Sequence, residues 1–493
     1  MKKNILKFSV IVSLAGFSLL AGCTDKFDEI NTDPDALVIA PPTNILADVL
    51  VGSGVSGFKF GDNLDLSDFT GHIVKIQYIN NYSDLIPTNN SWGNRWAKCY
   101  RNNTQLKVIL QNTEEQADAN KNIRFVARIW QNYMWSFCTD VFRDIPYTEA
   151  LKGAAEEGAI LKAKYDKQED IYPSVMASLK QIADEMAEGV GTDDIGEGDF
   201  IYDGKILKWQ RFCNSLRLRM AIRISAVAPE LAKSTIEEIC GNPAKYPFID
   251  DTDSQCYLKW QGSEPFYEPY YNNKRTRDDY GMSEIFINHL KEMNDPRLAV
   301  VAKPAETDGE YRGFQNGALS QPTELGSISR IGTLYREDPK GFSPYYKASE
   351  SFFNIAEAAM LGYQVGMTAK EAYEKAVTLS MKENGLTEDD AQTYLAGKAK
   401  WDNTKERIWW EEWVALFKEN EEAWALYRRT GIPSTHYVPI RSIYGSAHTS
   451  QPFRLPYPDN EYKYNKANLD VALQGVEDYC WGKPMWWDTR NAK

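Results

Sequence analysis

The sequence has few of the residues on which catalytic and metal sites most often depend. Its 493 residues include four histidines (His72, His289, His436 and His448) and seven cysteines, without a C-x-x-C pair. H-E-x-x-H, P-loop and G-x-S-x-G motifs are absent. The segment Gly52–Gly57 matches G-x-G-x-x-G, but a helical pattern precedes it, so we interpret it as a turn. No motif indicates a metal or a cofactor, whereas abundant carboxylates leave a glycosidase-like acid pair open.

Basic residues are outnumbered by acidic ones, and the net charge is −13. Nucleic-acid binding requires clustered Lys and Arg, so this class of function is disfavoured. Aromatic residues are frequent instead, at 13% of the chain with 14 Trp and 28 Tyr. Core packing rarely needs so many Trp and Tyr, and we expect some of them on a solvated surface.

Apolar runs long enough to span a membrane are also missing. The run Phe8–Leu20 has only 13 residues, follows the basic head Met1–Lys7, and ends in Leu20-Ala21-Gly22-Cys23. This combination fits a secretory signal and resembles a bacterial lipobox, which predicts removal of residues 1–22 and acylation of Cys23. The acidic segment Thr24–Glu29 resembles a surface-export signal of Bacteroidetes lipoproteins, or is a solvated tether. Residues 23–493 are then expected to form one lipid-anchored body.

Helical periodicity dominates this body. It predicts helices over 96–110, 123–137, 166–187, 207–227, 352–362, 368–385 and 403–429. Asp166 with Glu169, and Thr368 with Glu371, have the spacing of an N-cap and its third-position acid. The segment 358–377 resembles a tetratricopeptide unit, which needs other helix pairs stacked on it.

Long irregular stretches separate the helices and hold most of the tyrosines. Two of them, near 78–92 and 260–280, combine aromatic rings with Asn and Arg. A sugar offers an apolar face to a ring and hydroxyl groups to polar side chains, so these segments are candidate ligand-binding loops. The candidate residues are Tyr78, Tyr82, Asn89, Trp92, Trp260, Tyr267, Tyr270, Tyr271 and Arg275.

Other conspicuous residues are interpreted as structural. Trp409, Trp410, Trp413, Phe417, Trp424 and Tyr427 recur at helical spacing and belong mostly to the core. Arg217, Arg219 and Arg223 are expected to form ion pairs, and Cys138 and Cys213 to be buried. A disulfide is possible in an oxidising compartment, but its pairing does not follow from the sequence.

Several motifs together resemble the SusD/RagB family of nutrient-binding outer-membrane lipoproteins, in its SusD-like branch. The most specific segment is Trp209–Ser225. The others are Phe27–Asp35, Asp140–Tyr147, Tyr165–Tyr172, Asn294–Leu298, Tyr311–Gly313, Ala356–Ala358 and Ala423–Gly431. Two departures are Phe142-Arg143-Asp144, where the family usually has Tyr-Gly-Asp, and Cys213, where Ala is common.

The resemblance implies a mainly α fold of four tetratricopeptide-like helix pairs with a loop-rich variable region. It further implies a location at the outer membrane, facing the cell exterior, and a role as a non-catalytic lid. This lid captures a glycan or similar oligomer and delivers it to a SusC-like TonB-dependent transporter. Because ligand-site residues vary within the family, none is carried over to this chain. A surface glycoside hydrolase is the alternative from another class.

Overall fold

The computed structural model describes residues 40–54, 65–79, 89–153, 158–318, 320–434, 452–475 and 483–489. Cys23, the predicted signal peptide and the segment Thr24–Glu29 lie outside these residues. All of the described residues except 40 and 41 belong to one compact unit, Pro42–Lys493.

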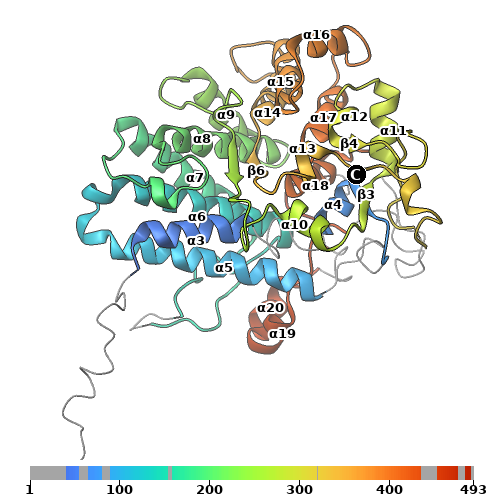
Figure 1. The fold of residues 1–493 in the computed structure, drawn as a ribbon. Coiled ribbons are helices and arrows are strands. Elements are labelled where there is room, and N and C mark those ends of the chain that lie inside the picture. Colours follow the sequence, from blue (N-terminus) through green and yellow to red (C-terminus); the bar gives the residue numbers. More distant parts are fainter. Residues whose placement is uncertain are drawn as a thin grey trace, which may run out of the picture. The chain divides into compact units, whose positions relative to one another are not determined.

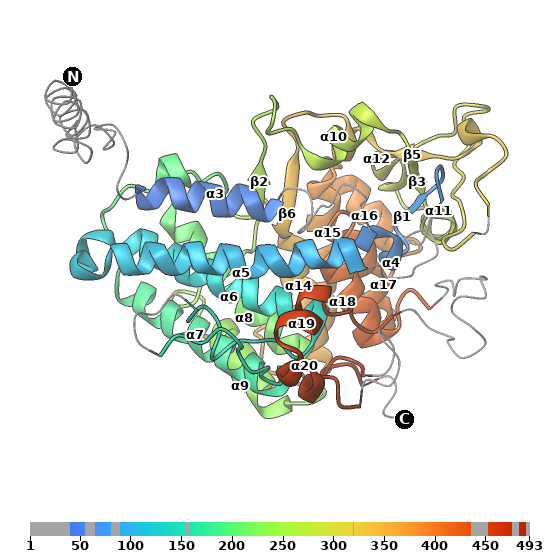
Figure 2. The same cartoon turned by 90° about the horizontal axis from the view of Figure 1, so that it is seen from below.

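Long helices form most of this unit (Figure 1). They are α3 (Pro42–Gly54), α5 (Asn89–Asn112), α6 (Lys121–Phe142), α7 (Gln168–Glu188), α8 (Ile206–Arg223), α9 (Pro229–Gly241), α14 (Ala348–Met360), α15 (Ala369–Glu383), α17 (Lys405–Ala415) and α18 (Asn420–Thr430). Consecutive helices pack as the pairs α5/α6, α7/α8, α14/α15 and α17/α18. Further contacts of α6 with α7, α8 with α14 and α14 with α17 join the pairs, while α3 lies along α5 (Figure 2). The mainly α, pairwise fold expected from the sequence is confirmed.

Short elements fill the connections between these pairs. The short helices are α4 (Asp65–Thr70), α10 (Pro269–Thr276), α11 (Glu284–Met293), α12 (Leu298–Val301), α13 (Thr333–Arg336), α16 (Glu388–Ala396), α19 (Asp459–Tyr464) and α20 (Lys466–Ala472). The 3-10 turns are η1 (Glu114–Gln116), η2 (Asp118–Asn120), η3 (Gly196–Gly198) and η4 (Leu325–Ser327). Antiparallel two-stranded sheets pair β1 (Ile73–Lys75) with β3 (Tyr280–Met282), β2 (Cys256–Lys259) with β6 (Phe342–Tyr346), and β4 (Ala302–Lys303) with β5 (Arg330–Ile331).

The observed helix starts confirm one of the two predicted N-caps and contradict the other. The capping box of Thr368 and Glu371 is present at α15, as predicted. The predicted N-cap at Asp166 is wrong, because α7 begins at Gln168 and Asp166 instead accepts hydrogen bonds from the backbone N–H groups of Tyr147 and Thr148. The α7 start is capped by a residue distant in the sequence: Asp144, just past the end of α6, accepts from the Gln168 N–H at 3.0 Å.

The single helix predicted over 403–429 is also wrong. The chain forms α17 and α18, and Lys418 between them has a left-handed φ of 71°. The break is held by tertiary contacts. Lys347 donates to the carbonyls of Ala415 and Phe417 at the end of α17, and Lys418 forms a buried ion pair of 2.9 Å with Glu268.

The aromatic stripe and the cysteines are distributed largely as predicted. Trp413, Phe417 and Trp424 are buried, whereas Trp409, Trp410 and Tyr427 are half-buried at the edge of the core. Within the described ranges, Cys99, Cys138 and Cys213 are buried free thiols, Cys240 is a half-buried free thiol, and Cys256 is buried. No helix in these ranges is long and apolar enough to cross a bilayer.

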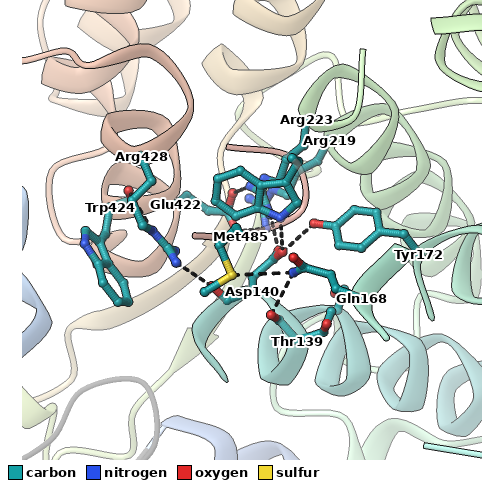
Figure 3. A network of polar contacts seen from close by, with 12 residues as sticks. Thr139, Asp140, Gln168, Tyr172, Arg219, Arg223, Glu422, Trp424, Arg428 and Met485 are labelled. Carbon is teal, nitrogen blue, oxygen red and sulfur yellow. Dashed lines mark hydrogen bonds and ion pairs between the residues drawn. The ribbon is translucent and has the colours of Figure 1, made fainter. Parts of the chain in front are cut away.

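A buried ionic network joins the helix pairs (Figure 3). Arg223 of α8 lies between Asp140 of α6 and Glu422 of α18, and forms an ion pair with each. Asp140 also accepts hydrogen bonds from the Tyr172 hydroxyl at 2.5 Å and from the Trp487 indole at 2.9 Å. One carboxylate thus connects α6, α7, α8 and the C-terminal segment.

The neighbouring arginines of α8 continue this pattern. Arg219 pairs with Glu350 at 2.5 Å and with Glu419 at 2.7 Å, which links α8 to α14 and to the start of α18. Arg217 pairs with Glu238 of α9. The predicted ion-pairing role of these arginines is confirmed.

Candidate functional site

The residues predicted to bind ligand divide into three groups in the structure. Tyr82 lies outside the described residues. Asn89 and Trp92 were predicted on a loop but lie in the first turn of α5, and the orientation of their side chains is not described. Tyr78, Trp260, Tyr267, Tyr270, Tyr271 and Arg275 are described with their side chains.

Two of these six belong to the core, which corrects the prediction that they lie on exposed loops. Trp260 is 5% exposed and its indole donates to Ser343 at 2.9 Å. Tyr270 is fully buried and its hydroxyl accepts from the Asn420 amide at 3.1 Å. Each residue pairs with a partner far away in the sequence, and neither offers a ring face to solvent.

The segment around α10 keeps an accessible aromatic and charged cluster. Arg275 lies over the Tyr267 ring, with its guanidinium carbon 4.2 Å from the ring centre. The Tyr271 ring follows at 5.5 Å from that of Tyr267. Arg275 also forms a 2.7 Å ion pair with Glu264, and this hydrogen bond raises the pKa of Arg275. The cluster therefore combines half-buried rings with a fixed positive charge.

The position of α10 is fixed by buried charge. Glu268 is its N-cap and accepts from the Tyr271 N–H at 2.7 Å. The same carboxylate pairs with Lys418 beneath it, and both side chains are almost completely buried. The helix start is thereby attached to the junction between α17 and α18.

A second ring lies beyond the other end of α10. Tyr78 follows β1, is 61% exposed, and has a left-handed φ of 53°. Arg277, just past α10, lies over this ring at 5.2 Å. Pairing of β1 with β3 brings Tyr78 close to this segment from a distant part of the sequence. Sequence reasoning missed Arg277, although it lies only two residues beyond Arg275.

We call Tyr78, Tyr267, Tyr271, Arg275 and Arg277 the α10 surface. Its rings offer apolar faces, and its guanidinium groups and Glu264 offer hydrogen-bond donors and acceptors. Such a mixture suits a ligand with both CH faces and hydroxyl groups. Within the described ranges, no group of three or more His, Cys, Asp or Glu side chains could hold a metal ion.

Sequence reasoning also missed a cavity of about 570 Å³ between α11 and the start of α17. His289 and Trp410 line it. In the sequence, His289 is one of four histidines without a recognised motif, and Trp410 belongs to the aromatic residues predicted to lie mostly in the core. No sequence signal connects them, because 121 positions separate them and only the fold brings their rings together.

Comparison with known proteins identifies the family to which this chain belongs. A family described as "Starch-binding associating with outer membrane" matches residues 50–458. The chain belongs to this SusD-like family. No protein among the curated sequences matches the chain.

Solved structures show the same SusD-like fold. A chitin-binding SusD homolog from Flavobacterium johnsoniae is 23% identical with a TM-score of 0.79, covering 91% of this chain and 99% of that one. A SusD-like protein from Bacteroides thetaiotaomicron is also 23% identical, with a TM-score of 0.78 and coverage of 92% and 99%. A SusD homolog from Bacteroides uniformis is 24% identical, with a TM-score of 0.76 and coverage of 91% and 100%.

Proposed function

We propose that this chain is a non-catalytic surface lipoprotein that captures a glycan and delivers it to a SusC-like TonB-dependent transporter. The family match over residues 50–458 carries the proposal, because that family is described as starch-binding and associated with the outer membrane. The chitin-binding homolog of the same fold supports a glycan as the class of ligand. In this proposal acylated Cys23 anchors the chain, residues 23–493 act as one lid, and ligand favours the closed lid by its higher affinity for it.

The α10 surface is proposed as the main contact with the glycan. Tyr78 supports this role, since a ring that is 61% exposed is stacked under Arg277 instead of packed into the core. Tyr267 and Tyr271 offer two further rings beside Arg275. The proposal keeps three further residues as glycan contacts, because they follow Tyr78 closely in the sequence. They are Tyr82, Asn89 and Trp92, which precede or begin α5.

Glycan binding is tested with the purified chain, by calorimetry against starch, chitin and host-type oligosaccharides. Tyr78→Ala should weaken binding roughly three- to tenfold, the range that corresponds to one lost aromatic contact. Arg275→Ala and Trp92→Ala should act in the same direction. Tyr464→Ala is the matched control, because Tyr464 of α19 is another tyrosine that is 71% exposed.

Two results would contradict the proposal. Release of sugar products from any polysaccharide by the wild-type chain would favour the glycoside hydrolase alternative. Equal affinity of the wild-type, Tyr78→Ala, Arg275→Ala and Trp92→Ala chains would show that the α10 surface is not the contact.

Anchoring and partnership need separate tests. Cys23→Ser should move the chain from washed membranes to the soluble fraction, and retention would contradict acylation. The transporter should copurify with the chain after mild detergent extraction. Its absence from the purified material would contradict the role as a lid.

A further inference from the structure

The cavity between α11 and α17 has the size and composition of a ligand site. Its volume of about 570 Å³ is within the usual range of about 300–1,000 Å³ for small-molecule pockets. Asn288, His289 and Glu292 line it from α11, and Glu406, Arg407 and Trp410 line it from α17. The site is separate in residues from the α10 surface.

Rigid aromatic rings form one wall of this cavity. The His289 ring stacks on Trp410 at 4.5 Å with 13° between the planes, and both meet the edge of Trp413. Burial lowers the pKa of His289 to about 4, so its imidazole is neutral at physiological pH. Its Nε2 is buried without a hydrogen-bond partner among the described residues. The wall thus offers apolar ring surface, while the His289 Nε2 atom itself is buried.

The charge around the cavity is unbalanced. Glu292, Asp402 and Glu406 contribute three carboxylates, against the single guanidinium of Arg407. Arg407 is already engaged by Asp402 at 3.2 Å. Glu292 and Glu406 are exposed on the rim. An anionic ligand would be repelled here, whereas hydroxyl groups or an ammonium group would be accepted.

A second cavity lies beside the first one. Met293, at the end of α11, also lines a cavity of about 330 Å³ that extends toward α16. Asn294, Asp390, Thr393 and Lys398 supply polar groups there. We call the two cavities, which share Met293, the α11–α17 groove, and two neighbouring cavities suit an oligomer better than a single small molecule.

We propose that this α11–α17 groove is a second saccharide-binding site, which takes neutral or amine-bearing sugars and rejects sugars that carry carboxylate or sulfate. The inference rests on the proposed glycan-binding function and assigns a further site to it. A sugar ring packs against Trp410 and His289, while Asn288, Glu292 and Glu406 bind its polar groups. Two separated sites on one chain would hold a long glycan at two points and increase the avidity of capture.

The test uses the whole mature chain and three oligosaccharides of equal length: N-acetylglucosamine, glucosamine and galacturonate oligomers. Hydrogen–deuterium exchange should show protection of residues 284–293 and 402–410 by the first two and not by the third. Protection confined to the α10 surface, or equal protection of the groove by the galacturonate oligomer, would overturn the inference.

Variants separate the contribution of charge from that of neutral hydrogen bonding. The double variant Glu292→Gln/Glu406→Gln should weaken binding of the glucosamine oligomer at the groove about fivefold and leave the N-acetylglucosamine oligomer nearly unchanged. Asn288→Ala should weaken both oligomers. Glu115→Gln, an exposed residue of η1, is the control.

The failure of this inference is distinguishable from failure of the proposed function. A wild-type chain that binds a glycan with no change in any groove variant overturns the second site and leaves the function standing. A wild-type chain that binds no glycan at all overturns the proposed function itself.

Discussion

Arg143 has a backbone conformation that L residues rarely adopt, with φ 76° and ψ −103° at the end of α6. The SusD-like motif that this segment resembles has Gly at the same position. The Arg143 side chain compensates by donating to the Pro484 carbonyl at 2.7 Å and pairing with Asp144 at 2.9 Å. Those contacts hold the C-terminal segment against the same aspartate that caps α7.

The strain at Arg143 predicts that glycine is more stabilising than alanine at this position, the reverse of the usual order in a helix. Arg143→Gly and Arg143→Ala lose the same contacts, but only alanine keeps the strained backbone. Strain of this kind costs about 1–3 kcal/mol, and the greater flexibility of unfolded glycine offsets about 0.5–1 kcal/mol of the difference. We expect the unfolding free energy of the Gly variant to exceed that of the Ala variant by about 1 kcal/mol, and urea unfolding measures this difference.

The control for this comparison is Arg101, an exposed position inside α5. There the Ala variant should be the more stable, by about 1 kcal/mol. The same order at both positions would contradict the interpretation of Arg143 as strained.

At the scale of elements, the junction between α17 and α18 depends on one buried pair. Lys418 is fully buried between Glu268 and the Tyr335 carbonyl, and burial lowers its pKa. Lys418→Met should destabilise the fold by about 3–5 kcal/mol, because it leaves the Glu268 carboxylate buried without its partner. Thermal unfolding measures this loss.

A double-mutant cycle sharpens this prediction. Lys418→Met combined with Glu268→Gln should cost less than the sum of the single variants, since the residues are in contact. Lys466→Met is the control, because Lys466 and Asp470 form an exposed pair on α20, and such pairs contribute only about 0.3–0.5 kcal/mol. Additive effects at Lys418 and Glu268 would show that the two side chains act independently.

Local signals in the sequence were sufficient to predict most helices. They were not sufficient to predict helix breaks and caps that depend on tertiary contacts. The Thr368 capping box involves residues three apart, so the sequence shows it completely. The break at Lys418 depends on Glu268 and Lys347, which no periodicity connects to it. The cap of α7 comes from Asp144, and so the nearer candidate Asp166 was misleading.

The candidate site was predictable in its segments but not in its individual residues. Tyr267, Tyr271 and Arg275 cluster at the surface as expected. Trp260 and Tyr270 have the same local composition, yet their partners Ser343 and Asn420 bury them. Exposure is decided by these distant partners and is not encoded in the local pattern.

At the scale of the whole molecule, stability should fall as the pH rises. Burial raises the pKa of Glu412 to about 8 and that of Glu383 to about 7, against an unfolded value near 4.5. A carboxyl with a raised folded pKa stabilises the fold below its unfolded pKa and loses that contribution as the pH rises through the folded value. We expect the unfolding free energy to decline between about pH 4.5 and 8, by at most about 1.4 kcal/mol per pH unit for each group.

Glu412→Gln tests this dependence, because the amide stays neutral at every pH. The variant should show a flatter pH profile and gain stability relative to wild type at pH 8. Denaturant unfolding at a series of pH values measures both effects, with the exposed Glu115→Gln as the control. A profile as steep as that of wild type would exclude Glu412 as a cause.

The contacts between the first and last thirds of the chain have a consequence for the order of folding. His72 lies 2.9 Å from the Trp413 carbonyl, the Trp413 indole donates to Thr70, and Phe69 stacks on Trp424. These contacts cross more than 340 residues of sequence. Contacts of such long range form late, so α4 lacks its packing partner α18 until the chain has been synthesised past residue 424, whereas β1 can pair with β3 earlier. Any chain truncated before that point would leave α4 without this partner and exposed to proteases.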